Sequence, residues 1–127
     1  MSGQAPHFGQ AWRDISRILR PGSTVETLVQ RVRNRVVSLD ADGVTLVSER
    51  TRKERTIRRE QFEFVWTQLT MSGRYVSKDH QPYIHSQMIC AILSLLPYVT
   101  AHYGSSFGPL TLTLRREGPT TRTRVNP

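Results

Sequence analysis

The sequence predicts an α+β domain in which a short, twisted antiparallel sheet of about four strands packs on two main helices, preceded by a short N-terminal helix. Three observations predict this class. Short β-branched segments alternate with turn signals up to Arg58. From Arg59 the apolar period changes from two to about 3.6, and a nearly continuous apolar run follows later in the chain.

The domain boundaries follow from composition. A chain of 127 residues most simply forms one domain. We expect a flexible N-terminus over 1–10, a single domain over 11–116 and a flexible C-terminal tail over 117–127. Between Ala11 and Arg20 the apolar residues recur at helical spacing, and Pro21-Gly22 ends the helix.

The β-rich part contains four expected strands. They are Ser23–Val29, Arg35–Leu39, Val44–Glu49 and Glu54–Arg58. A basic connection at Gln30–Asn34 joins the first expected strand to the second, and a turn at Arg50–Lys53 joins the third to the fourth. Between them, Asp40-Ala41-Asp42-Gly43 has the residues of a tight turn, because Asp supplies local hydrogen bonds and Gly accepts a positive φ.

The second half of the chain favours helices. Arg59 to Ser72 has apolar residues at i, i+3, i+4 and i+7, and Gly73 is placed to cap its end. Arg74–Val76 is expected to be an extended link, and Ser77 to cap a single turn through Asp79. A helix from Tyr83 or Ile84 to Leu96 is apolar nearly all round, which indicates a buried position.

The chain is strongly basic, and half of its Arg and Lys residues lie from Arg31 to Arg59, mostly in the part that is expected to form the sheet. Lys plus Arg number 18 against 10 Asp plus Glu, giving +8, and only two of the 18 are lysines. Arginine has a planar fork that matches phosphates and base edges. A GC-rich genome, which favours Arg codons over Lys codons, would explain the same arginine preference, and a solvated strand face would explain the same clustering of charge. The candidate binding residues are Arg31, Arg33, Arg35, Arg50, Arg52, Lys53, Arg55, Arg58 and Arg59.

The expected topology brings two basic segments together. In an up-and-down arrangement, the connection at Arg31–Asn34 and the turn at Arg50–Lys53 emerge at the same end of the sheet. Arg31, Arg33 and Arg35 also share parity, so an extended chain directs them to one side. We therefore expect a small nucleic-acid-binding protein that grips the phosphate backbone, with DNA a better candidate than RNA.

Other chemistries have weaker signals. A helix-turn-helix would use the helix up to Leu96 as its reader, but that helix has few polar residues to read base edges. His80 and His85 are five apart across Pro82, and the single cysteine, Cys90, excludes a paired-cysteine zinc pattern. No nucleophile elbow, phosphate loop or dinucleotide fingerprint occurs. We expect no enzyme activity, no metal and no cofactor.

The same features bear on location and partners. The chain shows no signal-peptide pattern, and its longest apolar stretch, Met88 to Pro97, is too short to cross a bilayer. We therefore expect a cytoplasmic protein with no membrane partner. The alternative function is a protein-interaction module, such as a homodimer. It would use the alternating Leu110–Leu114 segment as an edge strand, with Tyr98, Tyr103 and Phe107 nearby.

A resemblance to a family covers about three fifths of the chain, from Gly22 to Val99. It lies in Asp42-Gly43-Val44, Ile57-Arg58-Arg59 leading to Phe62-Glu63, the Leu69–Gly73 helix end, and Ser86 through Ala91-Ile92-Leu93 to Leu96-Pro97. These features resemble small accessory modules of bacterial restriction endonucleases and related defence proteins. The resemblance implies a noncatalytic module that contacts DNA or a partner protein.

Overall fold

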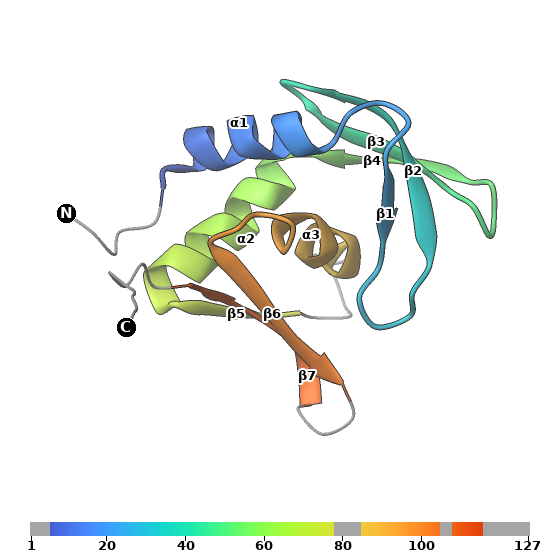
Figure 1. The fold of residues 1–127 in the computed structure, drawn as a ribbon. Coiled ribbons are helices and arrows are strands. Elements are labelled where there is room, and N and C mark those ends of the chain that lie inside the picture. Colours follow the sequence, from blue (N-terminus) through green and yellow to red (C-terminus); the bar gives the residue numbers. More distant parts are fainter. Residues whose placement is uncertain (1–5, 78–84, 105–107, 116–127) are drawn as a thin grey trace, which may run out of the picture.

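The computed structural model describes residues 6–77, 85–104 and 108–115, and within them it contains three helices and two antiparallel sheets (Figure 1). This confirms the predicted α+β class. The elements are α1 (Phe8–Ile18), β1 (Thr24–Glu26), β2 (Arg33–Asp40), β3 (Gly43–Ser48), β4 (Glu54–Arg58), α2 (Arg59–Ser72), β5 (Arg74–Val76), α3 (Ser86–Leu93), β6 (Val99–Gly104) and β7 (Gly108–Leu114).

The first sheet has the strand order β1-β2-β3-β4, with every neighbouring pair antiparallel. One face is apolar and fully buried, through Val36, Val44, Leu46 and Ile57. A register shift between Val36 and Ser38 adds to the twist of the sheet. The predicted up-and-down arrangement and the predicted bounds of β4 are therefore confirmed.

Helices α2 and α3 lie between the two sheets (Figure 1). The bounds of α2 are those predicted, and its four periodic apolar residues are buried. Gly73 follows α2 with φ 82° and donates its N–H to the Leu69 carbonyl, as a left-handed cap requires. In α3 only Gln87 is not buried, so this helix packs in the core and cannot serve as a reading helix in a groove.

The second sheet is the main feature that the sequence did not predict. Its order is β5-β7-β6, so the segment expected as an edge strand is the central one. Leu110 and Leu112 are buried within it. The expected extended link at Arg74–Val76 is β5, and β6 was not anticipated. The prediction of an edge strand at Leu110–Leu114 was wrong, because both of its edges already have hydrogen-bonded neighbours.

Several boundaries differ from the predicted ones. Helix α1 begins at Phe8, inside the segment expected to be flexible, because Phe8 packs on Trp12 and the Trp66 Nε1 atom donates to the Pro6 carbonyl. Strand β2 begins at Arg33, where Asn34 is already buried. Helix α3 ends at Leu93 rather than Leu96. The expected single turn after Ser77, the expected start of α3, Phe107 and the C-terminal tail lie outside the described residues.

Candidate nucleic-acid interface

Two hairpin loops emerge at the same end of the first sheet, as predicted. Residues 27–32 join β1 to β2, and residues 48–53 lead from β3 to β4. The N–H of Glu49 donates to the Arg33 carbonyl at 2.9 Å, which ties the base of the second loop to the first residue of β2. Figure 1 shows both loops on the side of the molecule away from the start of α1. We call these two loops, with Arg55 of β4, the basic tip.

The two loops have the same internal backbone hydrogen bonds. In the first, the Thr27 N–H donates to the Val32 carbonyl and the Arg31 N–H donates to the Thr27 carbonyl. In the second, the Ser48 N–H donates to the Lys53 carbonyl and the Arg52 N–H donates to the Ser48 carbonyl. In each loop, the opening hydroxyl oxygen also accepts a backbone N–H, from Val32 and Thr51 respectively.

The last residue but one of each loop is an arginine in the left-handed region. Arg31 has φ 61° and Arg52 has φ 64°, and these are the only non-glycine residues with positive φ in the described part of the chain. Glycine or asparagine is usual there, because a Cβ atom costs roughly 1–2 kcal/mol in this region. A strained position occupied by arginine in both loops is an outlier that motivates a functional hypothesis. The sequence contains a pattern that could have indicated these two loops, since a residue with a hydroxyl group lies four positions before each of the two arginines.

The exposed face of the first sheet does not carry a large excess of unpaired positive charge. Arg31 lies 3.5 Å from Glu26, and Arg33 lies 3.7 Å from Glu49, both as exposed ion pairs. Arg35 occupies the same cross-strand row as Val47 and Glu54. Two of these three arginines are therefore paired with glutamates, and Arg35 has Glu54 two strands away in the same row.

Four basic residues of the second loop and β4 have no ion pair with any described residue. They are Arg50, Arg52, Lys53 and Arg55, and all four are exposed. Arg55 pairs across from Leu46, so it extends on the side of the sheet that faces the helices. The unneutralised charge therefore lies at the tip and on its inner side, where it is available to an anionic partner.

Arg58 and Arg59 lie at the other end of the sheet and do not belong to the basic tip. Arg58 pairs across from Gly43 and forms an exposed 3.1 Å ion pair with Glu60. The guanidinium of Arg59 lies over two aromatic rings, 5.3 Å from the Phe8 centroid and 5.8 Å from that of Trp12. These contacts hold α1 against α2 and so give Arg59 a structural role, while the binding role predicted for it stays a prediction.

The sheet is therefore polarised along its strands. At the tip end, seven basic residues from Arg31 to Arg55 face Glu26, Glu49 and Glu54, a net of +4. At the other end, four acidic residues accompany Arg58 and Arg59, a net of −2, and they are Asp40, Asp42, Glu60 and Glu63. A polyanion is attracted to one end of this sheet and repelled from the other.

A cavity of about 220 Å³ lies between α2 and α3. Its walls are largely apolar, and its lining residues are Glu60, Gln61, Phe64, Val65, Tyr75, His85, Ser86 and Ile89. The Nδ1 atom of His85 is excluded from solvent and has no hydrogen-bond partner among the described residues. Burial, and secondarily the charge of Arg55, lowers the pKa of His85 and favours its neutral form.

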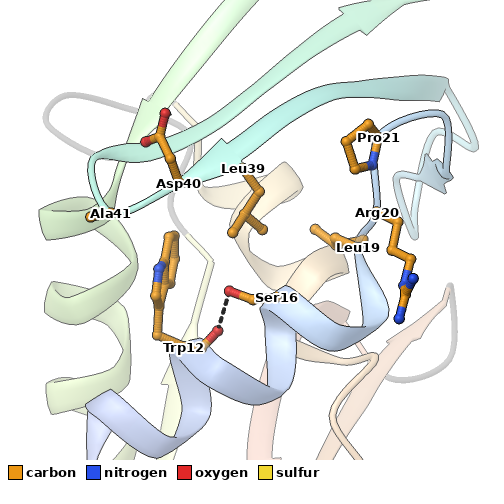
Figure 2. Close-up of a pocket in the computed structure, with 8 residues that line it drawn as sticks. All are labelled: Trp12, Ser16, Leu19, Arg20, Pro21, Leu39, Asp40 and Ala41. Carbon is orange, nitrogen blue, oxygen red and sulfur yellow. Dashed lines mark hydrogen bonds between the residues drawn. The ribbon is translucent and has the colours of Figure 1, made fainter.

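A second, wider hollow of about 530 Å³ separates α1 from the turn between β2 and β3 (Figure 2). Figure 2 shows Trp12 and Leu39 facing it, with Arg20 and Asp40 on opposite sides. The Ser16 hydroxyl already donates to the Trp12 carbonyl at 2.8 Å. Because its polar groups do not converge, this hollow has no arrangement that would orient a ligand.

Comparison with protein families, with curated proteins and with solved structures gives no match to this chain. The resemblance to accessory modules of defence proteins therefore stays a prediction. Among the described residues, no helix is both long and apolar enough to cross a membrane.

Proposed function

We propose that this protein binds nucleic acid, with DNA the first candidate, by gripping the phosphate backbone through the basic tip. One observation carries the proposal: two loops of the same conformation lie at one end of a sheet, and each holds an arginine in a strained left-handed position. Arg50, Lys53 and Arg55 add unpaired positive charge beside them. Phosphates are the chemical groups that such a set of exposed guanidinium groups fits best.

The geometry suits contacts to the backbone rather than to bases. The two hairpins are separated by about two strand spacings, roughly 10 Å at their bases. Contacts of arginine and lysine with phosphates fix the position of a protein on nucleic acid but carry no sequence information. We therefore expect affinity that depends weakly on base sequence and steeply on salt, because each neutralised phosphate releases counterions.

The test compares two triple variants that remove the same charge. In the first, Arg50, Arg52 and Arg55 are replaced with Ala. In the control, Arg13, Arg20 and Arg74 are replaced, which are exposed arginines outside the tip. Fluorescence anisotropy with a labelled oligonucleotide measures the affinity. We expect the tip variant to lose ten-fold or more near 50 mM salt, and to reduce the log–log salt slope by about 2.7.

The control variant should lose much less affinity with an unchanged slope. Equal losses in the two variants would show attraction to net charge without a defined interface. No measurable affinity of the unmodified protein for DNA or RNA at low salt would overturn the proposal.

A second candidate function, self-association, is favoured by one observation. Strand β6 pairs with β7 on one side only among the described residues, and it contains no Lys, Arg, Asp, Glu or Pro. Edge strands of monomeric proteins usually carry such residues to block pairing. Sedimentation of the protein and of a Thr100→Lys variant at high concentration tests this candidate, since a dimer paired through β6 should become a monomer in the variant.

A further inference from the structure

The cavity between α2 and α3 has the size and lining of a site for one flat ring. Its volume of about 220 Å³ is below that of sites for drug-sized ligands, which begin near 300 Å³. Phe64, Val65 and Ile89 form apolar walls of the cavity. The Phe64 residue itself is 42% exposed to solvent. An exposed aromatic ring beside an apolar pocket is an arrangement on which a nucleobase can stack.

Two polar groups in the cavity would orient such a ring. The buried Nδ1 atom of His85 has no partner among the described residues, and an unsatisfied buried polar atom is costly until a ligand supplies its hydrogen bond. Gln61 uses its Oε1 atom to accept the Arg58 N–H at 3.1 Å, which leaves its amide nitrogen as a donor. A nucleobase edge presents both donors and acceptors to such groups.

Arg55 of the basic tip lies on the side of the first sheet that faces the helices and the cavity. That residue extends on the helix-facing side of β4, and its positive charge acts on His85. A phosphate held by Arg55 would therefore place the base of the same or the adjacent nucleotide beside the cavity. A lipid chain or an apolar peptide has no anionic group that would pair with the Arg55 guanidinium.

We propose that the cavity receives an unstacked base of a single-stranded nucleic acid whose phosphates lie on the basic tip. The inference rests on the proposed function and deepens it by naming the form of nucleic acid that binds best. A duplex keeps its bases paired and stacked, so it engages the tip alone. A single strand gains the additional contact of one base with Phe64 and His85.

The test uses three DNA ligands of the same length: a single strand, a duplex, and a single strand of abasic sugar-phosphate. The full chain is compared with Phe64→Ala and His85→Gln, and with Met71→Ala as the control. Met71 is 79% exposed on the same helix as Phe64 and does not line the cavity. We expect Phe64→Ala to weaken single-strand binding about ten-fold and to leave duplex and abasic binding unchanged.

His85→Gln keeps a polar side chain but changes its hydrogen-bonding geometry, and we expect a smaller loss with the same ligand dependence. The control should bind all three ligands as the unmodified protein does. If abasic and ordinary single strands bind equally, the base site is overturned while salt-dependent backbone binding still stands. If none of the three ligands binds, this inference and the proposed function fail together.

Discussion

The hydroxyl of Tyr98 donates a 2.5 Å hydrogen bond to the Oδ2 atom of Asp14, and so joins the turn before β6 to the first helix. Tyr98 also packs edge-on against Trp66 of α2, with ring centroids 6.0 Å apart. Asp14 accepts further hydrogen bonds from Gln10 and Arg17 on its own helix. Tyr98 thus links three segments that are distant in the sequence, because its hydroxyl binds α1 and its ring contacts α2.

Replacing Tyr98 with Phe should therefore destabilise the fold without disturbing the ring contact. A hydrogen bond to a charged acceptor contributes about 1.5–3 kcal/mol, and we expect a loss at the lower end because the site is only partly buried. The measurement is the free energy of unfolding in urea. The control is Tyr103→Phe, since Tyr103 is 42% exposed and should change stability little. Equal effects in both variants would contradict the link between Tyr98 and Asp14.

Stability should fall in alkaline solution because of Cys90. Burial raises the pKa of this thiol from 9.0 to about 12. Between these values the unfolded chain loses a proton that the folded chain retains, so rising pH favours unfolding. We expect the free energy of unfolding to drop by about 1 kcal/mol from pH 9 to pH 10 through this residue.

Urea unfolding of Cys90→Ala at the same two pH values isolates this contribution, and the pH-dependent part should largely disappear. Tyr98 adds a further loss only above about pH 10, because burial and then its bond to Asp14 raise its pKa. A slope between pH 9 and 10 that persists in Cys90→Ala would contradict the assignment.

Gly43 should not tolerate a side chain. Its φ is 155°, and a Cβ atom built there would lie 2.3 Å from the Ile57 carbonyl oxygen, a backbone atom that cannot move aside cheaply. We expect Gly43→Ala to destabilise the protein by more than about 2 kcal/mol, since conformational strain and overpacking add. Gly73→Ala is the comparison, because Gly73 has φ 82° with nothing within 4 Å and should cost only about 1 kcal/mol. Thermal unfolding of both variants measures the difference.

The sequence predicted those features that depend on local periodicity and turn chemistry. The apolar spacing of Phe62, Val65 and Leu69 determined α2, and Asp40 to Gly43 determined the turn that joins β2 to β3. The position of the two basic loops at one end also followed, because it requires only the alternation of antiparallel strands.

The second sheet could not be predicted in the same way. Strand β5 has three residues, and its partner β7 lies more than thirty residues later in the chain, so its pairing depends on how α2 and α3 pack. Residue-type counts also cannot reveal which charges are neutralised. Glu26 is five positions from Arg31, and Glu49 is sixteen from Arg33, yet each pair meets across the sheet or its loop.

The strained arginines predict a trade between stability and binding. Arg52→Gly removes the steric strain of the left-handed conformation from the folded state, but it also increases the conformational entropy of the unfolded chain. The first effect is the larger, so we expect a net stabilisation of about 0.5–1 kcal/mol. The same change should weaken DNA binding. Arg50→Gly is the matched control, because Arg50 lies in the same loop with an ordinary φ and should lose stability slightly. Stabilisation by Arg52→Gly with full binding would mean that the strain serves no interface.

Arg55 and Arg59 should separate binding from folding, although they are only four residues apart. Arg55 is exposed at the tip without an ion pair among the described residues, so Arg55→Ala should weaken DNA binding and leave the urea midpoint nearly unchanged. Arg59 lies over Phe8 and Trp12, and each such cation–π contact contributes about 0.5–1 kcal/mol at a partly exposed site. We expect Arg59→Ala to destabilise the protein by about 1 kcal/mol and to retain DNA affinity wherever the fold is intact. Because both variants remove one positive charge, a loss of affinity in Arg59→Ala equal to that in Arg55→Ala would show that DNA responds to net charge and not to the basic tip.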